Sequence, residues 1–351
     1  MGRANLLLLP RTGRKVNIRI TLWFMEKKGK FVSVVRNQKS PSFSSAAAGH
    51  TGVPIVRNDM KLGIKLESEW EPLFIPGKVC SYVNDHTIYK NSLGKYILLG
   101  TAAKGEYSPL KENFFVRAES KSLNSKMSNE QKVFRNNPHI GPKIAPHVFF
   151  DEKTSIYHLF FAPGIIFHYI SKDGESWERA DDAVSSWWVW LRDPHVIESD
   201  GQYLMYLTDM GNKITVFRSN DLFRWKKDKT ALRLGDDIPK SFNSSCESPC
   251  IFKWERWFIL TTTITTSPTS RRENYTRTVA FAAKDPTNFG VFTKNTKGTS
   301  NDIGYLDIHA PEVIQDGKRI YITSCGWKDF PKPTGIKDEG VFIRNISLYE
   351  Y

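Results

Sequence analysis

The chain has 351 residues, of which 40% are hydrophobic and 25% are charged, a composition typical of a folded globular protein rather than a disordered one. No run of about 18 apolar residues occurs, which argues against a membrane-spanning helix. The formal net charge of +13 would suit a nucleic-acid-binding protein if it were spread along the chain.

The positive charge is instead concentrated at the N-terminus. Residues 1–57 hold eleven Lys and Arg but one acidic residue, Glu26, whereas residues 58–351 hold 39 basic and 36 acidic residues, a net charge of +3. We therefore predict a basic tail or targeting segment over residues 1–57 and expect no nucleic-acid partner. This N-terminal segment does not resemble a standard secretion signal, because its apolar core, Leu6–Leu9, is too short.

Five later segments repeat one pattern: a polar or proline-containing start, a β-branched or apolar pair, a turn and an aromatic-rich strand. Their anchor residues are 62, 46, 54 and 62 positions apart, about the length of one four-stranded propeller blade. The repeat predicts an all-β fold, a five-bladed β-propeller over residues 70–351, with a β-sandwich as the alternative. In chain order, the segments are residues 84–99, 145–160, 192–206, 247–260 and 309–323.

Shorter signals support the repeat. Asp200-Gly201 and Asp316-Gly317 are typical of tight hairpin turns between strands. Residues 166–177 and 214–225 each read as a strand that ends in Ser-x-Asp, with a Trp four residues after that Asp. The last segment, residues 340–351, reads as a strand that could close the ring and so remove exposed strand edges.

The first residues of the five segments would meet at one mouth of the central channel, because the innermost strand of each blade lines it. Three of these residues are carboxylates, Asp85, Asp193 and Glu247, which we take to occupy equivalent positions of the repeat. Carboxylates held close together acquire different pKa values, so that one stays protonated while another is ionised. Cleavage of a glycosidic bond needs such an acid and such a base.

With these motifs in place, the sequence resembles the five-bladed propeller glycosidases, most of all family 43 of the glycoside hydrolases, over about residues 70–351. The motifs are Val83-Asn-Asp-His-Thr, Leu191-Arg-Asp-Pro-His, Ser245-Cys-Glu-Ser-Pro and Ile308-His-Ala-Pro. One departure is His86, which stands where that family usually has proline.

The resemblance implies an inverting hydrolase that degrades a poly- or oligosaccharide. Asp85 would be the general base, Asp193 would tune the pKa of the acid, and Glu247 would be the general acid. Inversion predicts that the carboxyls of Asp85 and Glu247 lie about 6.5–9.5 Å apart. His309 would be the central histidine, near a metal or its water; no cofactor is required, and a structural calcium in the channel is left open.

Other residues near the motifs are candidates for sugar binding. His86, His147 and His195 could donate hydrogen bonds to sugar hydroxyls, although a buried structural histidine is an equally good interpretation of each. Trp188 or Trp190 could stack on a sugar ring, or pack between blades. Arg192 could hold Asp193 or another carboxylate, with a salt bridge between blades as the alternative.

Three alternatives to this function stay open: a non-catalytic carbohydrate-binding propeller, a retaining fructosidase-type enzyme and a phosphorolytic relative. The expected partner is a carbohydrate substrate, and we expect a monomer without a membrane span. Polysaccharide degradation would favour secretion, but the chain has no clear signal peptide, so its location stays open.

Overall fold

The structure is a computed structural model that describes residues 62–139, 141–185, 191–210, 212–238, 245–265, 277–293, 301–326 and 339–351. The predicted tail, residues 1–57, lies outside these ranges. Apart from one 3-10 turn, η1 (Pro109–Lys111), the regular elements in the described ranges are strands, so the all-β prediction is confirmed. None of the described segments forms a helix long and apolar enough to cross a membrane.

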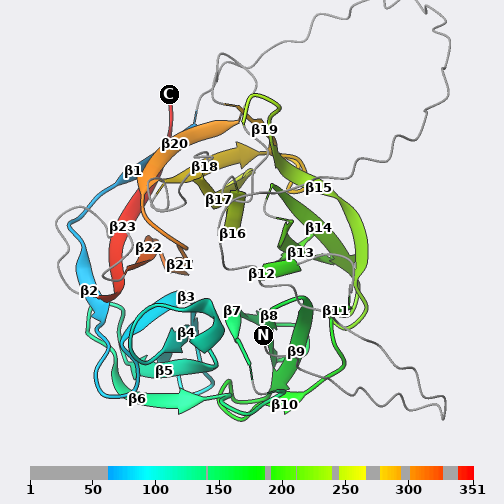
Figure 1. The fold of residues 1–351 in the computed structure, drawn as a ribbon. Helices are drawn as coiled ribbons and strands as arrows, with labels where there is room; N and C mark the ends of the chain where they lie inside the picture. The colour runs from blue at the N-terminus through cyan, green and yellow to red at the C-terminus, as the bar shows by residue number, and fades with distance from the viewer. Residues whose placement is uncertain are drawn as a thin grey trace, which may run out of the picture. The chain divides into compact units, whose positions relative to one another are not determined.

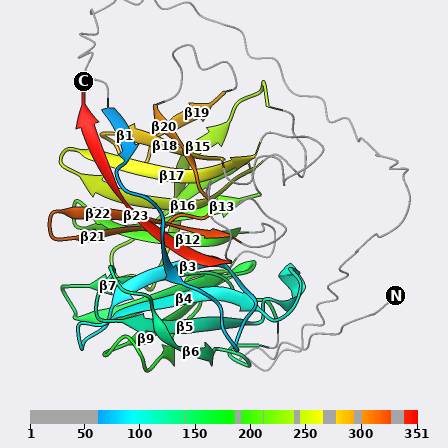
Figure 2. The same ribbon diagram turned by 90° about the vertical axis from the view of Figure 1, so that its left-hand side faces the viewer.

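The strands form five sheets arranged in a ring, which confirms the predicted five-bladed propeller (Figure 1). Seen from the side, the strands run roughly along the axis of the ring (Figure 2). The first blade contains β3 (Tyr82–Lys90), β4 (Tyr96–Ala103), β5 (Phe114–Ser120) and β6 (Ser128–Val133). The second contains β7 (Ile144–Asp151), β8 (Ile156–Ala162), β9 (Ile165–Ser171), β10 (Glu178–Arg179) and β11 (Val184–Ser185).

The third blade contains β12 (Leu191–Ser199), β13 (Gln202–Asp209), β14 (Lys213–Ser219), β15 (Lys226–Leu234) and β19 (Gly290–Phe292). The fourth contains β16 (Ser245–Trp254), β17 (Trp257–Thr265), β18 (Arg277–Ala283) and β20 (Asp302–Asp307). The fifth contains β21 (Val313–Asp316), β22 (Arg319–Gly326), β23 (Gly340–Glu350), β1 (Leu62–Leu66) and β2 (Glu71–Phe74).

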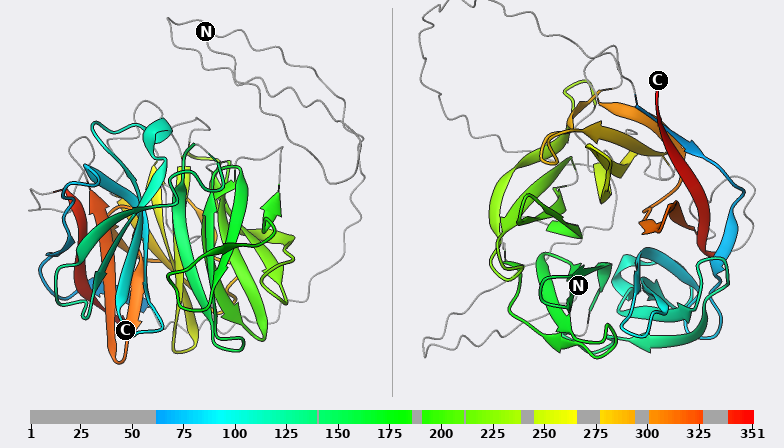
Figure 3. Two further views of the ribbon diagram at one scale, coloured as in Figure 1. Left: turned by 90° about the horizontal axis from the view of Figure 1, so that it is seen from below. Right: turned by 180° about the vertical axis from the view of Figure 1, so that it is seen from behind.

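The fifth sheet joins the two ends of the propeller. The C-terminal strand β23 pairs with β22 on one side and with β1 and β2 on the other, as the side-by-side red and blue strands of Figure 3 show. Each of the five residues of β1 has a partner in β23. The ring is therefore closed by strands from both ends of the chain, and the closing strand β1 begins ahead of residue 70, the predicted start of the propeller.

Hydrophobic side chains hold neighbouring blades together. One buried cluster lies between the first and second blades and contains Phe115 and Phe161, whose rings meet edge to face at 5.2 Å. Another lies between the third and fourth blades and contains Tyr206 and Phe281. Three further clusters join the remaining neighbours. Apolar burial between every pair of adjacent sheets fixes the blades around the axis, so that residues far apart in sequence meet there.

The short sequence signals are confirmed as local structure. Asp200 and Gly201 connect β12 to β13, and both have positive φ, 52° and 77°, as a tight hairpin turn between twisted strands requires. In the outer strands, the Ser171 hydroxyl donates to Asp173, and the Ser219 hydroxyl donates to Asp221 in the same way. The two Ser-x-Asp segments are therefore the same turn in neighbouring blades.

Candidate active site

The three predicted carboxylates lie on the innermost strands of three blades: Asp85 on β3, Asp193 on β12 and Glu247 on β16. Each lies in or beside a β-bulge, where two residues of the innermost strand face a single residue of the next strand. The pairing is interrupted in this way between Val83 and His86, Ile144 and His147, Arg192 and His195, and Glu247 and Cys250.

The bulges explain the prolines of the repeat. In four blades the residue before the proline has a positive φ, between 44° and 56°, and the proline is the second of the two residues at the bulge, a position that needs no N–H for the ladder. These four residues are Ala145, Asp193, Ser248 and Ala310. In the first blade the corresponding pair is Asn84-Asp85, so the aspartate stands where the other blades have proline.

The prediction that the three carboxylates are equivalent in the repeat is therefore wrong. Relative to the bulge, Glu247 is the residue before it, Asp193 is its first residue and Asp85 is its second. Sequence alignment of the motifs by their acids conceals this shift, because the register of a strand cannot be read from residue types. The three acids come from different blades and stand at different positions in or beside the bulge.

Asp85 and Asp193 line one narrow cavity at the axis of the ring, with a volume of about 20 Å³, enough for a single water. The bulge residues of all five blades surround it. Its lining consists of Asp85, His86, Ala145, Pro146, Asp193, Pro194, Ser248, Pro249, Ala310, Pro311 and Glu312.

Ser248 links two of the carboxylates. Its hydroxyl donates a hydrogen bond of 2.9 Å to Asp85 Oδ1, and its backbone N–H donates one of 3.1 Å to Asp193 Oδ2. The Thr208 hydroxyl donates a second hydrogen bond, of 2.7 Å, to the same oxygen of Asp193. The sequence analysis did not identify Ser248 as a site residue, although its place beside Glu247 in a repeated motif was visible.

Arg192 links Asp193 to Glu247. Its Nε lies 3.4 Å from Asp193 Oδ2, and its Nη2 donates to Glu247 Oε2, so one guanidinium contacts carboxylates of two blades. The Ser245 hydroxyl donates to the other oxygen of Glu247 at 3.2 Å. Both interpretations offered for Arg192 therefore hold: it pairs with Asp193 and with Glu247, and the second contact is a salt bridge between blades.

The environment of Asp85 favours its protonated form. Burial, followed by the negative charge of Asp193, raises the pKa of Asp85 to about 7, although the hydrogen bond from Ser248 opposes that rise. Burial also raises the pKa of Asp193, and here the charge of Arg192 opposes the rise. The two neighbouring carboxyls, Asp85 and Asp193, therefore have different environments. Acid–base catalysis uses pairs of carboxyls that differ in this way.

Two further glutamates lie near Asp85. Glu112 is buried, accepts a hydrogen bond of 3.2 Å from Asn84 Nδ2, and has a pKa raised to about 8, first by burial and then by the charge of Asp85. Burial raises the pKa of Glu312 well above its usual value, and Asp85 adds to the effect. Glu112 follows β4 in a connection without a repeat signal, whereas Glu312 could have been found, since its motif His309-Ala-Pro-Glu matches the other proline motifs.

The structure separates the predicted sugar-binding histidines. His86 lines the cavity of Asp85, with its Nε2 2.7 Å from Thr323 Oγ1. His147 and His195 line a second opening of the channel together with Glu312. His309 is buried, with Nδ1 3.2 Å from Cys325 Sγ, and burial lowers its pKa to about 3. Trp188 and Trp190 lie outside the described residues.

The predicted calcium in the channel and the predicted metal or water near His309 stay predictions. Calcium takes six to eight oxygen ligands, typically carboxylates and carbonyls. Within the described ranges, one cluster has the donors for a metal ion, and it consists of His147, His195 and Glu312, with two imidazoles and without His309.

Several solved structures that share the fold are arabinofuranosidases or arabinanases. The catalytic domain of an α-L-arabinofuranosidase from Coprinopsis cinerea is 12% identical, with a TM-score of 0.56 over 78% of this chain and 95% of that one. An α-L-arabinofuranosidase from Podospora anserina is also 12% identical, with a TM-score of 0.54 over 79% and 95%. An exo-1,5-α-L-arabinanase from a bovine ruminal metagenomic library is 13% identical, with a TM-score of 0.54 over 77% and 96%.

These likenesses concern the fold, since the identities are low. No protein-family model matches the chain, and a comparison with curated proteins finds no significant match.

Proposed function

We propose that the protein is a glycoside hydrolase that cleaves O-glycosidic bonds of a poly- or oligosaccharide with inversion of configuration. The observation that carries the proposal is the chain of contacts from Asp85 through Ser248 to Asp193, and from Asp193 through Arg192 to Glu247, at the axis of the ring. The fold likeness to arabinofuranosidases and an arabinanase supports the same reaction class and makes arabinofuranosides the first substrates to test.

In this mechanism Asp85 is the general base. Its ionised carboxylate accepts a proton from a water that attacks the anomeric carbon, and the narrow cavity beside it has room for that water. Because the pKa of Asp85 is about 7, the base becomes available as the pH rises through neutrality. The Ser248 hydroxyl fixes the orientation of the carboxylate.

Glu247 is the general acid in this mechanism and protonates the departing oxygen. Asp193 and Arg192 lie next to Glu247 and set its charge environment, so they position the acid and tune it rather than react themselves. After one turnover the acid has lost a proton and the base has gained one, and exchange with solvent restores both.

The proposal is tested with aryl α-L-arabinofuranosides and arabino-oligosaccharides, followed by xylosides, galactosides and fructosides, with the product anomer observed by NMR. On a substrate that the wild-type protein cleaves, Asp85→Asn and Glu247→Gln should each reduce kcat by about 10²–10⁴-fold. Glu247→Gln should retain most of its activity on a dinitrophenyl glycoside, whose leaving group needs no proton, whereas Asp85→Asn should be inactive on both.

The matched control is Asp200→Asn, a change of the same kind in an exposed hairpin turn, which should leave the rate unchanged. Near-wild-type hydrolysis by either site variant would contradict the assigned roles. A product with retained configuration would contradict inversion and favour a fructosidase-type mechanism. Sugar that binds but is recovered intact would favour a non-catalytic carbohydrate-binding propeller.

A further inference from the structure

A second group of chemically active side chains lies along the channel, and two of its members, His86 and Glu312, also line the cavity of Asp85. The residue that follows each bulge occupies one equivalent position in all five blades, and its side chain lies near the axis. In blade order these residues are His86, His147, His195, Cys250 and Glu312.

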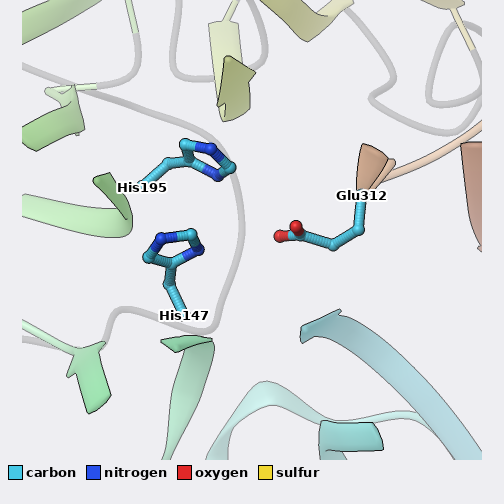
Figure 4. A group of neighbouring side chains, drawn as sticks. All are labelled: His147, His195 and Glu312. Carbon is cyan, nitrogen blue, oxygen red and sulfur yellow. The ribbon is translucent and has the colours of Figure 1, made fainter. Parts of the chain in front are cut away.

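Three of these side chains meet. One donor atom from each of His147, His195 and Glu312 lies within 4.8 Å of the other two. The two imidazole rings have centroids 4.2 Å apart, and Figure 4 shows both rings directed toward the Glu312 carboxylate. The three residues come from the second, third and fifth blades, so the ring closure itself brings them together.

The hydrogen bonding leaves imidazole nitrogens available. His195 Nε2 lies 2.9 Å from the carbonyl oxygen of Ile251, to which it donates in the tautomer that leaves Nδ1 as an acceptor. That Nδ1 is buried and has no hydrogen-bond partner among the described residues. His147 is also buried, and neither of its ring nitrogens makes a hydrogen bond of good geometry to a described residue, although the backbone of Val196 lies near the ring.

A buried polar atom without a hydrogen-bond partner destabilises the fold unless a ligand satisfies it. A metal-bound histidine typically donates its other ring N–H to a backbone carbonyl, which fixes the tautomer. His195 has this arrangement, with Ile251 as the acceptor. Glu312 would supply the negative charge that a cation requires once the bound ion displaces the carboxyl proton.

We propose that His147, His195 and Glu312 form a binding site for a divalent transition metal, zinc in the first instance, on the axis of the propeller. Two imidazoles and a carboxylate are a known zinc ligand set, and imidazole donors favour zinc, copper, iron and nickel over calcium or magnesium. The ion would be bonded to three blades at once, and water would complete its coordination. Its role is to stabilise the closed ring, and this proposal does not depend on the glycosidase assignment.

The site is tested on the full-length wild-type protein after treatment with a chelator and dialysis. Addition of Zn²⁺ should give about one bound ion per chain by elemental analysis and should raise Tm, whereas equal concentrations of Ca²⁺ or Mg²⁺ should not. Co²⁺ should give the visible absorption spectrum of a site with nitrogen and oxygen ligands and fewer than six ligands.

The variants His147→Gln, His195→Gln and Glu312→Gln should each weaken zinc binding by at least about 100-fold and abolish the rise in Tm. His168→Gln is the matched control: this histidine is also buried in the second blade, but it lies beside His158 rather than in the cluster, so its variant should bind zinc like the wild type.

Wild-type protein that binds no zinc, or that gains equal stability from calcium, would overturn the proposal. Zinc stoichiometry unchanged in all three variants would also overturn it, since the ion would then lie elsewhere. If a histidine variant fails to fold, Glu312→Gln, which preserves the side-chain shape, and the wild-type Co²⁺ spectrum still decide the question.

Discussion

At the scale of single residues, the site depends on a guanidinium that serves two blades. Arg192 contacts Asp193, its neighbour in the chain, and Glu247, in the next blade. A planar guanidinium can hold two carboxylates at fixed angles, whereas the ammonium of a lysine acts as a point charge on a flexible stem. The geometry of the proposed acid therefore depends on the shape of Arg192 as well as on its charge.

Arg192→Lys keeps the charge and loses the shape. We expect kcat/KM to fall by about 10–100-fold, because a small displacement of Glu247 is enough to impair proton transfer. The change in Tm should be small, since a cation stays beside both carboxylates. Steady-state kinetics and a thermal melt check this, and a variant as active as wild type would show that the two-blade contact does not position the acid.

Protonation of Asp85 should also affect stability. Its pKa is about 7 in the folded protein and near 3.8 in the unfolded chain, so the unfolded state ionises first as the pH rises. Ionisation therefore destabilises the fold progressively between about pH 4 and pH 7, and the penalty is complete above pH 7. Glu112, with a pKa raised to about 8, contributes in the same direction.

Asp85→Asn removes this penalty and keeps an oxygen to accept the Ser248 hydrogen bond. We expect the variant to match the wild type near pH 4 and to be more stable at pH 8, by about 1–4 kcal/mol. Urea unfolding at the two pH values measures the difference. A stability difference that does not grow with pH would mean that Asp85 is not held protonated by its surroundings.

At the scale of the elements, the bulge decides what the sequence could and could not predict. The repeated Asp-Pro and Ala-Pro motifs predicted five innermost strands, because proline and turn residues recur at blade-length intervals. The same motifs did not show that Asp85, Asp193 and Glu247 stand at different positions of the bulge. That difference depends on strand register, which the one extra residue of each bulge changes.

The sequence did not predict which residues of different blades contact one another. The link through Ser248 joins residues 163 positions apart, and the cluster of His147, His195 and Glu312 draws on three blades. Neither can be read from local spacing, because both depend on how the sheets pack around the axis. The separation of the Asp85 and Glu247 carboxyls stays a prediction, as do the absence of a nucleic-acid partner and the monomeric state.

At the scale of the whole molecule, closure of the ring involves both ends of the propeller. The sequence predicted the C-terminal strand, now β23, but not its partner β1, which has only five residues and a weak alternation. Leu62 of β1 is buried among side chains of the fourth and fifth blades. The loss of β1 would expose that cluster and leave one edge of β23 unpaired.

A pair of truncations tests the closure. Deletion of residues 1–57 should leave Tm within about 2 °C of wild type, because it spares β1. Deletion of residues 1–66 removes β1 and should lower Tm by about 5–10 °C. Three apolar side chains, Leu62, Ile64 and Leu66, then lose their contacts with the cluster, and a domain of this size shifts by about 2 °C per kcal/mol. Equal melting temperatures for the two truncations would contradict a stabilising role for β1.

The closing pair also constrains when the protein can become complete in the cell. β1 leaves the ribosome early, but β23, its hydrogen-bonding partner, begins about 270 residues later. At about 5–20 residues per second, translation of that interval takes about 15–55 s. During this time the chain exposes an unsatisfied strand to other nascent chains and to chaperones. The ring can therefore close only after β23 has been synthesised, even if the first blades fold earlier.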